Sequence, residues 1–280
     1  MKKKIFIGSG IILIAVIIVA ALLFYPSIRF FTEKETVQVD HTLTLMLGGG
    51  GNSGIIIGDS AVVVIDTKMM GSSKDLYKLA KANAGLKPII VVNTHYHSDH
   101  VNGNKYFKGD KIYIGNYNRE FLQKNIEAEN QPTDFVNDSL SINIGGEVIH
   151  LYNLGQAHTL NDLVVYLENH KVLFTGDLIF NHVNPVLKDE SGARVTQWIK
   201  VLDIIINRWG NCTIVPGHGK VGGIEMAQSM RKYFVDMTTA AQYPTKEDQI
   251  KEKYKDWMKV LNMSSPEKTI KYIKMYETNK

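Results

Sequence analysis

Cysteine is almost absent from this sequence. Cys212 is the only one among 280 residues, so no disulfide bond can form within the chain, and the folded part must rely on its hydrophobic core for stability. Cys212 follows the turn residues Gly210 and Asn211 and enters an apolar run. This position favours a small packing residue over a metal ligand.

Charged side chains are missing from one long segment near the N-terminus. Residues 5–25 contain none, and only Ser9 is polar. A helix of this length spans about 31 Å, enough to cross the ~30 Å hydrocarbon core of a bilayer. Lys2, Lys3 and Lys4 precede the segment, and this asymmetry predicts an N-terminus in the cytoplasm with the rest of the chain on the other side.

We therefore expect residues 1–31 to be a membrane anchor or an uncleaved signal. The protein would then be a single-pass protein of the cell membrane, with its folded domain extracytoplasmic, either periplasmic or extracellular. Secretion after cleavage near Ala21 is the alternative. The apolar run continues beyond that point through residues 22–25, which favours the anchor.

Acidic residues are also absent from residues 1–31, and this absence explains the net charge. Lys2, Lys3, Lys4 and Arg29 account for the whole formal charge of +4, which leaves residues 32–280 with 28 basic and 28 acidic side chains. A neutral domain gives no electrostatic reason to bind nucleic acid, so we expect no nucleic-acid partner.

Short runs rich in valine and isoleucine alternate with helical patterns over residues 41–222. The predicted strands are 43–47, 54–57, 61–66, 88–94, 111–114, 147–152, 162–167, 171–175 and 213–216, and the predicted helices are 73–83, 118–129 and 195–208. Alternating strands and helices, with some strands in adjacent pairs, predict a layered α/β architecture.

Two further segments flank this pattern. Residues 31–40 are interpreted as a linker, and residues 223–280 are predicted to form a helical extension packed on the domain. The extension is expected to break at Pro244 and Pro266. Its predicted apolar stripe consists of Tyr254, Trp257, Met258 and Leu261.

The glycine-rich segment at residues 48–51 lacks the lysine and serine or threonine that complete a phosphate-binding loop. A strand rather than a helix is predicted after it, so both features argue against a nucleotide-binding role. We expect a flexible hairpin over a nearby site, or a tight turn.

Histidine and aspartate, in contrast, are concentrated after the predicted strands. The residues concerned are His95, His97, Asp99, His100, His158, Asp177 and His218. Imidazole and carboxylate groups that converge on one edge of a sheet are the ligands of a pair of zinc-like cations. His41, His150 and His170 lack this context and are expected at surface or strand positions, whereas His182 is a candidate to line the pocket.

Five motifs, in this order and spacing, resemble those of the metallo-β-lactamase-fold superfamily over about residues 41–222. They are Val63–Thr67, His95–His100, Gly155–Thr159, Thr175–Asp177 and Pro216–Gly219. The resemblance implies a four-layer αββα sandwich with metals at one edge of its two sheets. It makes residues 32–222 the catalytic domain, between the anchor and the helical extension.

The resemblance also implies a role for each ligand. It places His95, His97 and His158 on one metal, and Asp99, His100 and His218 on a second metal, with Asp177 as the bridge. Two Zn²⁺ ions are implied, with iron or manganese as alternatives. Asp99 and Asp66 are the candidate catalytic residues: Asp99 orients the nucleophile, and Asp66 supports the ligands from behind.

These expectations define a dinuclear zinc hydrolase in which a hydroxide bridging two zinc ions attacks a small acyl substrate, either an ester, a thioester or a lactam. Lys188, Arg194 and Lys220 are candidates to bind a substrate carboxylate. Asp177 stands where the commonest zinc β-lactamases have cysteine, and its Thr-Gly-Asp-Leu context resembles glyoxalase-II-like thioesterases.

Three alternatives stay open at this point. They are a β-lactamase proper, a phosphodiester-cleaving member of the same fold, and a non-catalytic, membrane-tethered binding protein. The complete ligand set argues against the last of these. The sequence does not define the oligomeric state.

Overall fold

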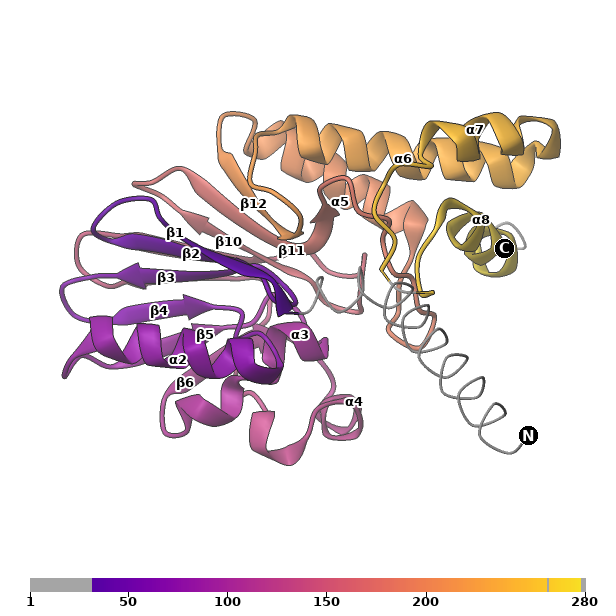
Figure 1. Cartoon of the computed structure of the whole chain (residues 1–280). Coiled ribbons are helices and arrows are strands. Elements are labelled where there is room, and N and C mark those ends of the chain that lie inside the picture. The colour runs from indigo at the N-terminus through magenta and orange to yellow at the C-terminus, as the bar shows by residue number, and fades with distance from the viewer. Residues whose placement is uncertain (1–31, 261, 278–280) are drawn as a thin grey trace, which may run out of the picture.

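The computed structural model describes residues 32–260 and 262–277, and in this part of the chain two β-sheets pack face to face (Figure 1). The seven-stranded sheet has the spatial order β1 (Lys34–Gln38), β2 (Leu43–Gly48), β3 (Ser53–Ile57), β4 (Val62–Ile65), β5 (Ile89–Val92), β6 (Lys111–Gly115) and β7 (Asp134–Val136). The five-stranded sheet has the order β12 (Thr213–His218), β11 (Val172–Phe180), β10 (Leu163–Leu167), β9 (Val148–Asn153) and β8 (Ser139–Asn143).

Helices cover the outer face of each sheet (Figure 1). Those on the side of the seven-stranded sheet are α2 (Met70–Ala84), α3 (Ser98–Val101), η1 (Asn104–Phe107), α4 (Arg119–Asn125) and η2 (Ala128–Asn130). Those on the other side are α5 (Val195–Arg208), α6 (Glu225–Gln242), η3 (Pro244–Lys246), α7 (Glu247–Lys253) and α8 (Pro266–Tyr276). The expected α/β sandwich is confirmed.

Strand β4 shows why the sequence forms this arrangement. All four of its residues are buried, and successive side chains of a strand point to opposite faces. Val62 and Val64 pack with Leu76 of α2, whereas Val63 and Ile65 belong to the core between the sheets. A strand covered on both faces reads as a continuous apolar run rather than an alternating one.

The parallel pairing of the strands brings the polar residues to one edge. Strands β4 and β5 are parallel, with Ile65 opposite Val92, so the residues that follow both strands emerge side by side. Strands β11 and β12 are also parallel, and their register is irregular between Phe174 and Phe180. The carboxyl ends of parallel strands meet at one edge of a sheet, where α/β proteins commonly bind ligands.

Strand β11 is longer than the sequence indicated. The prediction ended it at Thr175, but the strand continues to Phe180 and therefore contains Asp177. Gly176 has a positive φ of 50°, and the register shift around it turns the chain without ending the strand. In the sequence, a glycine after an apolar run indicated the end of the strand.

Edge strands were the main omission of the sequence prediction. Residues 34–38, interpreted as part of a linker, form β1, which pairs with β2 along its whole length. Strands β7 and β8 were also missed. These strands are short and largely solvent-exposed on one side, so their sequences carry few apolar residues to mark them.

The described part of the C-terminal region is mostly helical, but the segment between α7 and α8 is not. Helix α6 ends before Pro244, and α8 begins at Pro266, as expected. Residues 254–260 and 262–265 are irregular instead of helical, so the predicted stripe was wrong as a helix face: Trp257 is buried, whereas Met258 is 45% exposed. Leu261 lies outside the described residues.

No helix within the described residues has the length and apolar character needed to cross a membrane. The predicted membrane segment, residues 5–25, lies outside the described part of the chain.

Candidate metal centre

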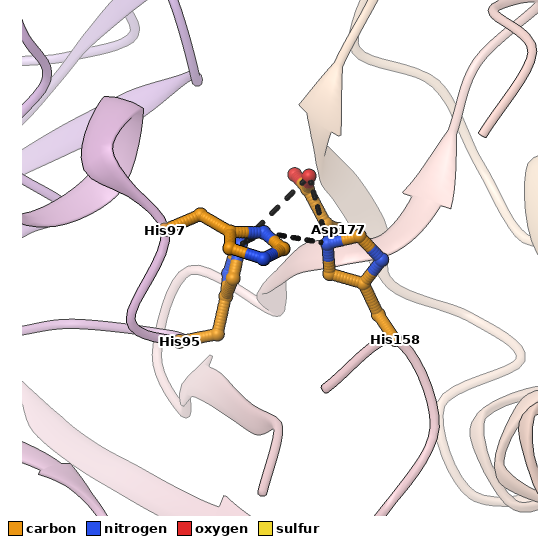
Figure 2. Close-up of side chains that lie close together, drawn as sticks. All are labelled: His95, His97, His158 and Asp177. Atoms are coloured by element: carbon orange, nitrogen blue, oxygen red, sulfur yellow. Dashed lines mark hydrogen bonds and ion pairs between the residues drawn. The ribbon is translucent and has the colours of Figure 1, made fainter. Parts of the chain in front are cut away.

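Three imidazoles converge at the edge of the sandwich (Figure 2). His95 and His97 follow β5, and His158 lies between β9 and β10. The Nδ1 atom of His97 is 3.1 Å from Nε2 of His95 and 3.0 Å from Nε2 of His158. Three ring nitrogens this close, on buried or half-buried side chains, present their lone pairs to one point.

A second group of ligand-type residues lies beside the first. It consists of Asp99 and His100 in the short helix α3, together with His218 at the end of β12. The Oδ2 atom of Asp99 is 3.3 Å from Nε2 of His218 and 3.7 Å from Nε2 of His100.

Asp177 faces both groups with different oxygen atoms. Its Oδ2 atom is 3.3 Å from Nε2 of His158 and 3.8 Å from Nε2 of His95. Its Oδ1 atom is 3.1 Å from Nε2 of His100 and 3.3 Å from Nε2 of His218. All seven residues named from the sequence as ligands are thus brought together, with Asp177 in the bridging position.

The spacing of these atoms suits tetrahedral cations. Ligands about 2.0–2.1 Å from a zinc ion lie roughly 3.3 Å from one another at the corners of a tetrahedron, and the distances given above run from 3.0 to 3.8 Å. In addition, Nε2 of His100 and Oδ1 of Asp177 are buried without a hydrogen bond. Buried polar atoms normally have a partner, and a shared cation would provide one.

Burial sets the charge of the first group. Desolvation lowers the pKa of His95 well below its usual value. Desolvation, together with the nearby His158, lowers the pKa of His97 to about 3. His95 and His97 are therefore neutral at pH 7, which is the form of imidazole that binds a metal.

Carboxylates set the charge of the second group. Burial favours neutral imidazole, but Asp66 and Asp177 outweigh it and raise the pKa of His100 well above its usual value. Against the same effect of burial, Asp177 raises the pKa of His218 to about 9. Burial favours a neutral carboxyl at Asp99, yet His100 and His218 hold its pKa well below the usual range.

Asp66 supports the second group from behind. Its Oδ2 atom is 2.8 Å from Nδ1 of His100, and its Oδ1 atom accepts a hydrogen bond of 2.8 Å from the backbone N–H of Thr94. A carboxylate on the far ring nitrogen fixes the orientation of a ligating histidine. Asp66 does not line the described cavity, so its contacts are those of a positioning residue rather than of the catalytic residue expected with Asp99.

Ser191 holds the first group in a similar way, and sequence reasoning missed it. Its Oγ atom lies 3.1 Å from Nε2 of His97 and accepts a hydrogen bond of 2.7 Å from the Tyr96 hydroxyl. With Nε2 engaged, Nδ1 of His97 is the atom left to face His95 and His158. Ser191 is nearly a hundred residues from His97, so no local pattern indicates the contact.

Lys68 is the second residue that sequence reasoning missed. It is completely buried, and its ammonium group donates hydrogen bonds of 2.6 Å to the carbonyl oxygens of Gly48 and Gly51. Burial lowers the pKa of Lys68 to about 7, although the nearby Asp66 and Asp99 oppose this shift.

Lys68 and Asn52 together hold the glycine-rich turn at residues 48–51. The side-chain oxygen of Asn52 accepts from the N–H of Gly48, and its amide donates to the carbonyl oxygen of Gly219 beside His218. A Cβ atom at Gly51 would lie 2.5 Å from the ring of His100, so glycine lets the turn pack on that ligand. The turn is held by side chains on both sides, as a tight turn and not as a free hairpin.

A cavity of about 240 Å³ opens onto the ligands. Its described lining consists of Met69, His97, Ser98, Asp99, His158, Asp177, Phe180, Val186, Lys188, His218, Val260 and Met263. Lys188 is the only lysine or arginine among them. Its apolar members are Met69, Phe180, Val186, Val260 and Met263.

The other substrate-binding candidates are placed differently. Arg194 donates to Asp189 at 2.8 Å and to the Tyr272 hydroxyl at 3.3 Å, so it is already engaged. Lys220 lines a separate hollow that shares only His218 with the cavity. Of the three candidates, only Lys188 faces the ligands' cavity.

The remaining histidines lie outside the centre. His41 is exposed, His150 pairs with Glu168 at 2.7 Å, and His170 contacts Asp40 at 3.1 Å. His182 is also exposed and stacks on a tryptophan with ring centroids 5.7 Å apart. It is not among the described residues of the cavity wall, so its expected place there was wrong.

Comparison with known proteins agrees with this geometry. The family model described as "Metallo-beta-lactamase superfamily" matches residues 46–218, more than half of the chain. The chain belongs to the metallo-beta-lactamase superfamily.

Members of this superfamily resemble the chain over most of their length. "Metallo-beta-lactamase type 2" of Bacteroides fragilis is 24% identical over 234 residues, which cover 79% of this chain and 93% of the relative. "Metallo-beta-lactamase IND-1" of Chryseobacterium indologenes is 28% identical over 61% of this chain and 73% of the relative. The solved metallo-beta-lactamase from Pontibacter korlensis, 21% identical, shares the fold with a TM-score of 0.63 over 71% of this chain and 99% of its own.

Proposed function

We propose that this member of the metallo-beta-lactamase superfamily is a dinuclear metal hydrolase that cleaves a small acyl substrate, namely an ester, a thioester or a lactam. The observation that carries the proposal is the carboxylate of Asp177, which presents one oxygen to each ligand group. Such a carboxylate is what two cations about 3.5–4 Å apart require.

His95, His97 and His158 would hold one cation, and Asp99, His100 and His218 the other, with zinc favoured by the imidazole-rich set. When bound, such cations lower the pKa of water so that hydroxide forms at neutral pH, and they polarise the oxygen of the substrate. Iron or manganese would fit the same nitrogen and oxygen donors.

The side chains of the chain orient the reaction. Asp99 lines the cavity as an anion, because His100 and His218 hold its pKa low, so it accepts a hydrogen bond from the attacking water. Water adds to the acyl carbon, the bond to oxygen, sulfur or nitrogen breaks, and the proton passes to the leaving group. Lys188 at the cavity wall would bind a carboxylate of the substrate.

A preference for β-lactams over other acyl substrates is a second candidate, because relatives that match over most of their length are named metallo-β-lactamases. This candidate differs from the first only in the substrate. A panel that contains nitrocefin beside esters, thioesters and lactones separates the two.

The test uses the full chain, purified in mild detergent because residues 5–25 are apolar. We expect close to two metal ions per chain and hydrolysis that a chelator abolishes and zinc restores. Less than one metal ion per chain, or full activity of Asp177→Ala, would contradict the proposal. Activity on phosphodiesters alone would move the assignment to phosphodiester cleavage.

We also propose that the enzyme is anchored in the cell membrane by residues 5–25, with the metal centre on the extracytoplasmic side. The support is the uncharged run itself and the lysines before it. Protease added to intact spheroplasts should then digest the domain, while the protein stays in the membrane pellet after alkaline washing. Recovery in the washed supernatant would show cleavage or a soluble protein.

A further inference from the structure

The wall of the cavity comes partly from residues beyond the range of the family match. That match ends at residue 218, whereas Val260 and Met263 line the cavity. Both belong to the segment of residues 254–265 that joins α7 to α8 (Figure 1). Val260 is 5% exposed and Met263 is 41% exposed, so the first anchors the wall and the second borders its mouth.

Hydrogen bonds hold this segment against the loop that follows β11. The N–H of Met258 donates to the carbonyl oxygen of His182 at 2.9 Å, and the N–H of Asn184 donates to the carbonyl oxygen of Met258 at 2.8 Å. The amide of the fully buried Asn184 also donates to the carbonyl oxygen of Trp257 at 2.9 Å. The segment therefore has a defined place beside the cavity.

Packing and a local turn fix the segment further. The ring of Trp257 stacks on Tyr233 of α6 with centroids 4.9 Å apart. The N–H of Val260 donates to the hydroxyl of Ser264 at 2.8 Å, and the N–H of Met263 donates to the carbonyl oxygen of Val260 at 2.9 Å. This turn presents Val260 and Met263 together on the side of the cavity.

Five apolar side chains belong to the described lining of the cavity, namely Met69, Phe180, Val186, Val260 and Met263. Methionine side chains are flexible and adapt to apolar groups of different shapes. A cavity lined both by ligand-type side chains and by apolar side chains suits a substrate with a scissile polar group and a hydrocarbon group.

We propose that Val260 and Met263, held in place by residues 254–260 and 262–265, form part of an acyl-chain-selecting wall of the enzyme, and that its substrates carry an apolar acyl group of several carbons. This inference rests on the hydrolase function proposed above and specifies its substrate class. A volume of about 240 Å³ holds a short acyl chain rather than a long lipid chain within the cavity. Each methylene group buried against the wall should raise kcat/KM about fourfold.

The test is a series of acetyl, butanoyl, hexanoyl and octanoyl thioesters with the metal-loaded full chain. We expect kcat/KM to rise from acetyl to hexanoyl. In Met263→Ser and Val260→Thr the ratio of kcat/KM for the hexanoyl thioester to that for the acetyl thioester should fall at least threefold. Met275→Ser is the matched control, because Met275 is 55% exposed on α8 and does not line the cavity.

A binding measurement separates this inference from the proposed function. Calorimetric titration with acetate, butanoate and hexanoate should give a Kd that falls with chain length in the wild type and less steeply in Met263→Ser. Equal Kd values along the series, or equal kcat/KM values with measurable acetyl hydrolysis, would overturn the inference and leave the hydrolase function standing. Chain-length-dependent binding without hydrolysis of any thioester would support the wall and contradict thioester hydrolysis.

Discussion

The two ligand groups of the centre share Asp177 but differ in charge. In the first group, His95 and His97 are buried with few carboxylates near them, and their pKa values are low. In the second group, His100 and His218 lie among carboxylates, and their pKa values are high. The same residue type at similar burial thus binds a proton weakly in one group and strongly in the other, because the neighbouring charges differ.

This difference has a consequence for metal binding. A neutral imidazole can bind a cation directly, whereas a protonated one must first release its proton. We therefore expect the first group to fill over a wide pH range and the second group to fill more readily at high pH. The predictions below test this difference, beginning with the largest effect.

Replacing Asp177 should damage both groups at once. Asp177→Ala removes a carboxylate that lies within 3.8 Å of four imidazole Nε2 atoms, two in each group. We expect kcat/KM to fall by about 10³-fold or more, since a bound cation contributes several kcal/mol to the transition state. Metal content and hydrolysis measure the effect. Asp248→Asn is the control, because Asp248 is 98% exposed, and an equal loss there would contradict the prediction.

The pH dependence of metal affinity should distinguish the groups. His218 has a pKa of about 9 without metal, so below pH 9 the cation displaces its proton. His100, whose pKa is also raised, must release a proton as well, so the affinity of the second group should fall by up to about a hundredfold per unit as the pH is lowered from 9 towards 6. In the first group, the low pKa values of His95 and His97 keep these two ligands neutral over this range, so they should add no pH dependence to the affinity. Competition with a chromophoric chelator at each pH measures both, and two parallel profiles would refute the difference.

The residues behind the ligands should affect the groups separately. Asp66→Asn replaces the carboxylate that contacts Nδ1 of His100. It should lower the metal affinity of the second group by about 10–100-fold. Ser191→Ala removes an uncharged hydrogen-bonding partner of Nε2 of His97. It should lower the metal affinity of the first group by about tenfold at most. Stepwise metal titration of each variant measures this, and a loss at the opposite group would contradict the assignment.

Removing the buried ammonium group should have the smallest effect. Lys68→Met leaves the carbonyl oxygens of Gly48 and Gly51 without their donor, and we expect the free energy of unfolding to fall by about 2 kcal/mol. The metal affinity of the second group should fall more than that of the first, because the glycine-rich turn packs on His100. Denaturant unfolding and metal titration measure these effects. Lys200→Met, an exposed substitution on α5, should change neither.

Central strands and ligand types could be predicted from the sequence because their signals are local. Residues 62–65 are apolar throughout, and a continuous apolar run is the local signal of a strand covered on both faces. The His95–His100 cluster could be recognised in the same way, since four ligand-type side chains fall within six residues. Edge strands such as β1 could not be predicted in this way, because they are largely exposed to solvent and their sequences are polar.

The contacts that position the ligands could not be predicted from the sequence, for a different reason. Lys68 resembles any surface lysine in the sequence, and its burial depends on a turn that the fold brings to it. Ser191 meets His97 across 94 positions of the chain, and Val260 reaches the cavity from a segment that was predicted to be helical. Pairings over such separations leave no periodic pattern.

By itself, the sequence determined which chemical groups this protein has for binding cations, because donor type is a property of each side chain. It also determined where along the chain the central strands lie. Only the tertiary structure decided the rest. It placed one oxygen of Asp177 towards each group, lowered the pKa values of His95 and His97 by burial while carboxylates raised those of His100 and His218, and brought Val260 and Met263 to the cavity. These outcomes depend on distances between residues far apart in the chain, and packing of the whole domain sets those distances.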